Sequence, residues 1–435
     1  MNGRRLLIST IWAALCAALL MPQFAAAAGS GSFSPTGSMS VPREGAGAAP
    51  LPDGRVLVAA GYFYDGSDRF LASAEAFNSQ AGSFSTAGIG SMGTARYFAA
   101  AAPLRDGRVL VTGGETPPAF AVTKTAEVFN PQTGAFSPVG PMEVARDGHA
   151  MALLPDGRVL VVGAGTPNAE VFDPQTNTFS SAGIGQMSTP RLAPIAAPLA
   201  DGRVLVAGGM ASGYLSSAEI FDPQTNTFSS AGIGSMTTPR VFAAAAPLPD
   251  GRVLIAGGQT SSSVHATASA EVFDPATNTF SSAGIGSMGT ARSTPVAAPL
   301  GDGRVLVAGG SQPGTGTYFS SAEIFAATNT FSFLVKGKKL IVSVQASGGV
   351  SLSDAKAPLS AVASRKKRKL LLKPSSASGG PQTIIVPLRL TKLAKAKLRR
   401  RGKLSVRARI TFKPQGGIAN TQTAKLKIAG KKRKK

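Results

Sequence analysis

Few residues of this chain have the types and spacing that catalysis requires. It has two histidines, His149 and His265, which lie far apart in the sequence, and one cysteine, Cys16. Two isolated histidines do not make a metal motif of the usual spacing. Most acidic residues recur at equivalent positions of a repeat, and an active site has no use for six copies of one carboxylate. We therefore predict no catalytic residue, no metal and no cofactor.

Six arginines form a different kind of candidate site. Each follows a methionine by four residues, and they are Arg43, Arg96, Arg146, Arg191, Arg240 and Arg292. Converging guanidinium groups could bind an anionic ligand, because arginine matches the geometry of carboxylate and phosphate. Alternatively, each arginine pairs with one of the equally repeated glutamates and holds the repeats together. These glutamates are Glu75, Glu127, Glu170, Glu219, Glu271 and Glu323.

Residues that break the repeat are better candidates for binding. Segments of variable length and content carry Tyr62, Tyr64, Tyr214, Tyr318 and His265, with charged residues such as Asp65, Asp68, Arg69, Glu115 and Lys124. His149, which falls in the predicted inner strand of the third repeat, is a further candidate. Tyrosine and arginine on variable loops over a rigid scaffold are typical of a binding face. Ordinary solvated loops are the alternative, because Ser, Thr and Gly dominate most of these segments.

The element that positions these residues is a repeat of about fifty residues. The string DGRVL recurs with its aspartate at positions 53, 106, 156, 201, 250 and 302. Each unit contains four short β-like runs separated by turn residues, which predicts a four-stranded antiparallel sheet. The Asp-Gly pair predicts a tight hairpin in which both central residues have positive φ.

Six such sheets predict a six-bladed β-propeller over residues 29–331, because stacking around an axis buries faces that no single sheet can bury. The arginines should then surround the mouth of the central channel. The outer-strand phenylalanine occurs seven times, from Phe33 to Phe331. We expect the segment around Phe33 to complete the last blade; the alternative places Phe331 there.

The repeat resembles the kelch family. The similarity lies in a glycine pair, as in Gly208-Gly209, in two aromatic residues seven apart, as in Phe221 and Phe228, and in the Met-x-x-x-Arg motif. Kelch-like propellers include copper radical oxidases similar to galactose oxidase, which need a cysteine-linked tyrosine, a second tyrosine and two histidines. The resemblance thus implies a galactose-oxidase-like propeller without the oxidase ligands.

The first 28 residues predict a secretory signal peptide. Arg4 and Arg5 precede the apolar stretch 6–21, and the alanines 26–28 offer a cleavage site. Removal of this segment also removes Cys16, so the mature chain would have no thiol. We therefore expect a secreted or cell-surface protein.

Residues 332–435 predict a separate basic domain. Residues 336–435 contain 28 Lys and Arg against one acid, whereas residues 1–335 have a net charge of −4. Residues 404–413 alternate apolar and polar side chains, as a half-buried strand does. Further strands are expected at 340–346, 370–372, 383–390 and 424–429, with a short helix within 391–401. We predict a small β-sandwich, Ig-like in general shape, that resembles the Lys-rich C-terminal β-domains of some secreted bacterial proteins.

The predicted function is that of a secreted, monomeric, non-enzymatic binding protein. Its propeller face would recognise a glycan or a protein, and its basic domain would associate with an anionic cell-wall polymer or lipid, without specific nucleic-acid binding. A purely solubilising role is the alternative for the basic domain. For the propeller, the alternative is an extracellular carbohydrate-active hydrolase or lyase.

Overall fold

The computed structural model describes residues 30–260, 265–327, 331–336, 339–344, 348–354, 371–379, 382–414 and 420–429. The predicted signal peptide and the basic runs 365–369 and 431–435 lie outside these residues. Within them, strands dominate, and no helix has the length and apolar character needed to span a bilayer.

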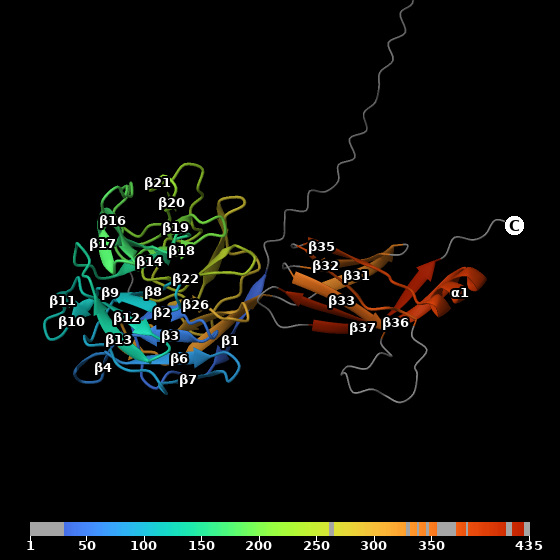
Figure 1. The fold of residues 1–435 in the computed structure, drawn as a ribbon, viewed down its shortest axis with the longest axis horizontal. Coiled ribbons are helices and arrows are strands. Elements are labelled where there is room, and N and C mark those ends of the chain that lie inside the picture. The colour runs from blue at the N-terminus through green and yellow to red at the C-terminus, as the bar shows by residue number, and fades with distance from the viewer. Residues whose placement is uncertain are drawn as a thin grey trace, which may run out of the picture.

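Residues 31–327 form six four-stranded antiparallel sheets (Figure 1). Each is given from its innermost to its outermost strand. Sheet 1 comprises β2 (Gly47–Pro50), β3 (Val56–Ala59), β6 (Ala74–Asn78) and β7 (Ser83–Ser85); sheet 2 comprises β8 (Ala100–Pro103), β9 (Val109–Thr112), β12 (Ala126–Asn130) and β13 (Ala135–Val139); sheet 3 comprises β14 (His149–Leu153), β15 (Val159–Gly163), β16 (Thr166–Asp173) and β17 (Thr178–Ser180).

The other three sheets follow the same plan. Sheet 4 comprises β18 (Ile195–Pro198), β19 (Val204–Ala207), β20 (Ala218–Asp222) and β21 (Thr227–Ser229); sheet 5 comprises β22 (Ala244–Pro247), β23 (Val253–Ala256), β24 (Ala270–Asp274) and β25 (Thr279–Ser281); sheet 6 comprises β26 (Val296–Pro299), β27 (Val305–Ala308), β30 (Ala322–Ala327) and β1 (Gly31–Thr36).

The innermost strands contact one another in a cycle, from β2 through β8, β14, β18, β22 and β26 and back to β2. We call this arrangement the six-sheet ring; it is consistent with a β-propeller. The second strand of every sheet is completely buried, as Val56–Ala59 illustrates. Burial on both faces explains why these strands read as unbroken apolar runs, without alternation.

β1 completes sheet 6, as expected for the segment around Phe33. It pairs with β30 in antiparallel register, with Phe33 opposite Phe325 and their ring centroids 5.0 Å apart. The other five sheets place the same two phenylalanines at 4.8–4.9 Å, as Phe77 and Phe84 show in sheet 1. The Phe331 alternative is wrong, because Phe331 begins a strand of the C-terminal domain.

The Asp-Gly turns differ from the expectation. In sheet 1 the Gly54 amide donates to the Leu51 carbonyl, and the Leu51 amide donates to the Arg55 carbonyl. Gly54 is the one residue of this turn with positive φ, at 85°. This is a three-residue hairpin loop in which glycine occupies the left-handed position. Asp53 does not need positive φ; its carboxylate accepts hydrogen bonds from the Arg55 amide and side chain.

Three small hairpins project from the segments that follow the second strands. They are β4 (Tyr62–Tyr64) with β5 (Asp68–Phe70), β10 (Glu115–Thr116) with β11 (Ala121–Val122), and β28 (Ser311–Gln312) with β29 (Thr317–Tyr318). They belong to sheets 1, 2 and 6, which are neighbours in the ring, so their side chains can meet in one sector.

The C-terminal domain has two sheets around one core. One comprises β31 (Phe331–Lys336), β32 (Lys339–Val344) and β35 (Gln382–Pro387); the other comprises β34 (Ser375–Gly379), β33 (Gly348–Asp354), β36 (Lys403–Pro414) and β37 (Asn420–Ala429). Leu340, Val350 and Phe412 belong to the shared core. The helix α1 (Lys392–Arg401) begins after Thr391, whose side chain accepts from the Ala394 amide.

Several tail elements were predicted incompletely. The strand expected at 370–372 is only an isolated bridge from Leu372 to Leu390, and β34 lies beside it in the sequence instead. β31 and β33 were not predicted. β33 and β34 consist largely of Ser and Gly, which are depleted in strands, so their place in the sheet depends on pairing with β36 and with each other.

Pairing of β1 with β30 predicts that Phe33 supports the melting temperature of the ring. We expect Phe33→Ala to cost about 2 kcal/mol, below the usual value for a fully buried phenylalanine because this ring is only half-buried. In a scanning calorimeter this corresponds to a fall of about 4–8 °C. Val122→Ala, in an exposed hairpin, is the control. An unchanged melting temperature for Phe33→Ala would contradict the closure.

Candidate functional site

The six repeated arginines are buried in the ring. Their exposed fractions are 1% for Arg43, 0% for Arg96, 1% for Arg146, 1% for Arg191, 2% for Arg240 and 0% for Arg292. Each forms an ion pair with the repeated glutamate of its own sheet, at distances from 2.8 to 3.4 Å. The expectation of an anion site at these arginines is therefore corrected: the guanidinium groups face protein acceptors and cannot reach a ligand.

Sheet 1 shows how one arginine joins two sheets. The Arg43 Nη1 donates to the carbonyls of Ala60 and Ser73, and Nη2 donates to Glu75, all within sheet 1 and its loops. The Arg43 carbonyl accepts from the Gly310 amide of sheet 6 at 2.8 Å. The side chain thus binds its own sheet and the backbone binds the preceding one. Burial lowers the pKa of Arg43, and Glu75 opposes that shift.

The glycine pair serves this junction in the four sheets that have it, which are sheets 2, 4, 5 and 6. At Gly209 φ is 88°, and a Cβ there would lie 2.7 Å from the Leu192 carbonyl oxygen. The Gly209 amide donates to the Arg240 carbonyl of the next sheet at 2.7 Å. Only glycine allows this close approach, so the kelch-like glycines and arginines are parts of one scaffold.

Symmetry-breaking aromatic residues meet at sheets 6, 1 and 2, and we call this group the tyrosine sector. Tyr62 is its centre: its ring centroid lies 4.8 Å from that of Tyr97, 5.8 Å from Tyr318 and 5.8 Å from Phe120. Phe70 packs at 4.7 Å from Phe120. Three hairpins and the residue that follows Arg96 thus contribute to a single aromatic cluster, in which Tyr62 is buried, Tyr97 and Tyr318 are half-buried and Phe120 is exposed.

Carboxylates border the tyrosine sector. The Tyr62 hydroxyl donates to Asp68 at 2.7 Å. Glu44 follows the buried Arg43 and lies near the hydroxyl groups of Tyr97, Thr294 and Ser311; burial raises the pKa of Glu44, and these hydroxyl groups oppose the shift.

Nearby, burial and then the charge of Asp147 raise the pKa of Glu115. The same surface therefore offers aromatic faces, hydroxyl groups and hydrogen-bond acceptors.

The remaining predicted binding residues lie elsewhere. Tyr64 is 53% exposed at the tip of its hairpin, and Tyr214 donates to Gln259 at 3.2 Å between sheets 4 and 5. His149 is 7% exposed and its Nε2 lies 2.6 Å from the Thr112 hydroxyl. Of the predicted tyrosines and histidines, Tyr62 and Tyr318 are brought together, and the predicted Asp68 accepts a hydrogen bond from Tyr62.

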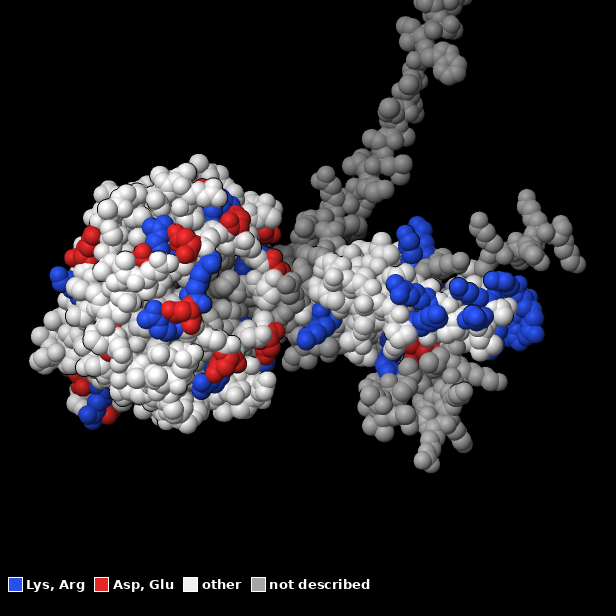
Figure 2. All heavy atoms as spheres, viewed as in Figure 1, with Lys and Arg blue, Asp and Glu red and all other residues white. Residues whose placement is uncertain are grey.

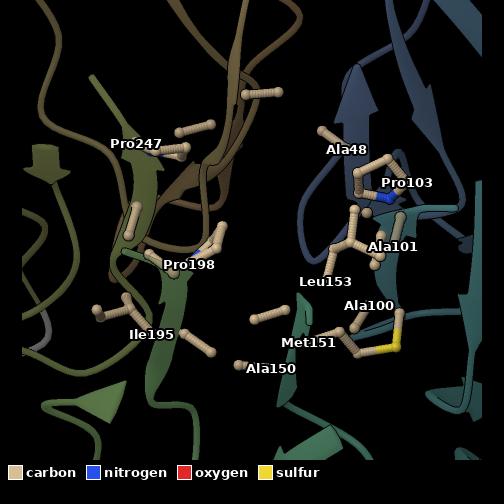
Figure 3. Close-up of a pocket in the computed structure, with 18 of the residues that line it drawn as sticks. Ala48, Ala100, Ala101, Pro103, Ala150, Met151, Leu153, Ile195, Pro198 and Pro247 are labelled. Carbon is tan, nitrogen blue, oxygen red and sulfur yellow. The ribbon is translucent and has the colours of Figure 1, made fainter. Parts of the chain in front are cut away.

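A cavity of about 460 Å³ runs along the axis of the ring. Small side chains of the innermost strands surround it, and Figure 3 shows Ala101, Pro198 and Pro247 facing it from different sheets. Sheet 3 departs from the pattern with His149 and Met151. Opposite charges in the exposed Asp-Gly-Arg turns surround the central hollow in Figure 2.

Two phenylalanines meet across the axis at the end of this cavity. Phe98 of sheet 2 and Phe242 of sheet 5 belong to opposite sides of the ring, and their rings stack with centroids 5.3 Å apart. Both have positive φ, at 54° and 56°, as does the equivalent residue of each other sheet, for example Thr294 at 51°. The stack lies two residues after Arg96 and Arg240 in the sequence, next to Ala99 and Ala243, which line the cavity.

Sequence reasoning missed Glu44, Tyr97, Phe98, Phe120 and Phe242. A signal existed for four of them: the two positions after each repeated arginine vary from sheet to sheet, whereas the arginine does not. Comparing these positions would have singled out Glu44, Tyr97, Phe98 and Phe242. Phe120 had no such marker.

Comparison with known proteins supports a kelch-type β-rich fold. A Kelch motif matches residues 191–232, which begin at Arg191 and include the strands of sheet 4. A solved fungal alcohol oxidase of the AA5 family, in complex with copper, is similar with a TM-score of 0.53 and 14% identity, over 92% of this chain and 100% of that one. At this identity the similarity concerns the fold alone. No curated protein matches the chain.

The residues present do not fit a copper radical site. No group of three or more His, Cys, Asp or Glu among the described residues could hold a metal ion. His149 lies against Thr112, His265 is exposed on a loop, and Cys16 lies in the predicted signal peptide.

The buried ion pairs predict a large cost for losing one arginine. We expect Arg240→Ala to destabilise the protein by about 3–5 kcal/mol, because Glu271 is left buried without its partner. Arg203→Ala removes the exposed pair with Asp201 and should cost less than about 1 kcal/mol. Urea unfolding of both variants measures the difference; equal values would refute the scaffold role.

The burial of His149 predicts that the protein loses stability in acid. Burial, reinforced by Arg146 and Arg96, lowers its pKa from 6.5 to about 3. The unfolded chain therefore binds a proton that the folded chain does not, so stability is complete above pH 6.5 and falls as the pH decreases towards 3. The expected slope is up to about 1.4 kcal/mol per pH unit. The variant His149→Ala places there the alanine that sheets 1, 2 and 5 have at the equivalent position, and it should remove this pH dependence of stability. Identical profiles of stability against pH for the variant and the wild-type protein would contradict the assignment.

Proposed function

We propose that the chain is a secreted, non-enzymatic binding protein built on a six-bladed kelch-type propeller, with the tyrosine sector as its recognition surface for a glycan or a protein. The carrying observation is the meeting of Tyr62, Tyr97 and Tyr318 beside Glu44 and Asp68. Aromatic faces with polar tips suit ligands that have both apolar and hydroxyl-bearing surfaces. All six repeated arginines are excluded from this surface by burial.

The second part of the proposal concerns the C-terminal domain, which we assign as an Ig-like sandwich that associates with anionic polymers of the cell envelope. Support comes from its charge: basic residues gather on α1 and on the exposed faces of β36 and β37 (Figure 2). Arg407 lies directly opposite Lys425. Like charges opposite each other destabilise a sheet, so an external polyanion would relieve a built-in repulsion.

An extracellular carbohydrate-active hydrolase or lyase is the second candidate. Glu44 favours it, because a carboxyl group with a raised pKa beside tyrosine hydroxyls has the properties of a general acid. A catalytic role would require turnover, which a binding role does not.

The test is a panel of isosteric variants. Tyr62→Phe, Tyr97→Phe and Tyr318→Phe keep the aromatic packing and remove hydroxyls, with Tyr214→Phe as the matched control outside the sector. On glycan and protein arrays, a ligand of the wild-type protein should lose about five- to tenfold in affinity with each sector variant, at about 1 kcal/mol per hydrogen bond, and should be unaffected by Tyr214→Phe.

Equal binding by all four variants would contradict the assignment of the tyrosine sector. A parallel assay for polysaccharide cleavage separates the two candidate functions: cleavage that Glu44→Gln abolishes would favour the enzyme.

A further inference from the structure

The C-terminal domain has a shallow groove on the face of its four-stranded sheet that points away from the core. The groove has a volume of about 520 Å³, and its lining includes Gly349, Ser351, Ser376, Ser378, Thr411 and Lys413. On the same strands, Val350, Leu352 and Phe412 point inward and are buried. Strand alternation therefore separates an apolar inner face from a polar outer face.

Strand register arranges the hydroxyl groups in a row. Ser351 lies opposite Ser376 on one side and Thr411 on the other, and Thr411 lies opposite Thr421. The Thr411 and Thr421 hydroxyl oxygens are 2.7 Å apart. Four hydroxyls thus cross four strands, about 4.8 Å from one strand to the next. Each can donate and accept, as the hydroxyls of a sugar do.

The floor of the groove is open at Gly349. A Cβ at this position would meet nothing within 4 Å, and its φ is not in the left-handed region. Glycine is therefore not required there by the backbone, and in a strand it is unfavourable. Its effect is to leave space between Ser378 and Lys413, which lie opposite it on the neighbouring strands.

Positive charge continues from the groove along the same face. Lys413 lines the groove, and Arg407, Lys425 and Lys427 are exposed further along β36 and β37. The described outward residues of these two strands include no acid and no aromatic residue. Sequence-tolerant recognition of single-stranded nucleic acid depends on aromatic stacking, which this face cannot offer.

We propose that this groove binds an acidic polysaccharide, with sugar hydroxyls on the row of Ser351, Ser376 and Thr411 and carboxylates on Lys413 and the basic residues beyond it. The inference rests on the proposed association of this domain with anionic polymers and specifies the polymer and its site. Hydroxyl groups provide selection for a sugar, and the lysines and arginines provide most of the attraction.

The experiment uses the mature full-length chain and polygalacturonate, with dextran as the neutral polymer and oligo-dT as the non-sugar polyanion. Gly349→Leu fills the groove without adding charge. Lys413→Ala and Lys427→Ala remove one charge each, inside and outside the groove. Affinity electrophoresis or titration calorimetry at 50 mM and 200 mM salt gives the dissociation constants, and thermal melting confirms the fold of each variant.

We expect wild-type protein to bind polygalacturonate more tightly than oligo-dT, and dextran weakly. Gly349→Leu should weaken polygalacturonate binding about tenfold and leave oligo-dT binding unchanged. Lys413→Ala should weaken it more than Lys427→Ala does. Should Gly349→Leu fail to fold, the double variant Ser351→Ala with Ser376→Ala removes the hydroxyls with almost no change in shape and should have the same effect.

Two results would overturn the inference in distinguishable ways. Tight, salt-sensitive binding of polygalacturonate that Gly349→Leu or the double serine variant leaves unchanged would refute the groove, while the proposed association with polyanions would stand. Absence of binding to both polyanions at 50 mM salt would refute the association itself, and the groove with it.

Discussion

The six-sheet ring depends on one buried interaction that is made six times. Each arginine places its guanidinium group against a glutamate and backbone carbonyls of its own sheet, while its carbonyl accepts from a glycine amide of the preceding sheet. A buried charge without its partner is strongly destabilising, so neither member can be lost alone. In sheets 2, 4, 5 and 6 glycine is needed at the junction because a side chain would collide with the neighbouring backbone. The most recognisable repeat residues are thereby committed to structure.

Recognition must then come from positions that the scaffold leaves free. The residues after each arginine and the small hairpins fulfil this condition, and in sheets 6, 1 and 2 they contribute Glu44, Tyr97, Tyr62 and Tyr318. The C-terminal domain follows a similar division: its inner face is apolar, and its outer face carries hydroxyls and positive charge. In both parts, the residues that follow the repeat or the strand alternation form the scaffold, and the residues that depart from the pattern are the candidates for binding.

Much of the ring could be predicted because its information is local. The DGRVL strings, the paired phenylalanines and the Met-x-x-x-Arg motif each specify a strand, a strand pair or a junction, and six copies reduce the ambiguity of any one. The sites were harder. Tyr62 and Tyr318 meet only because sheets 1 and 6 close the ring, and Tyr97 joins them from sheet 2. In the tail, β33 and β34 escaped prediction because Ser and Gly have little intrinsic preference for strands, and their pairing partners are distant in sequence.

The pairing of β1 with β30 also imposes an order on the folding of the chain during its synthesis. Phe33 precedes the other five sheets in the sequence, whereas its partner Phe325 follows all of them. Contacts between such distant segments are slow to form, because the intervening chain must be brought together first. During synthesis β1 therefore stays without its partner until β30, the strand that it pairs with, has been translated.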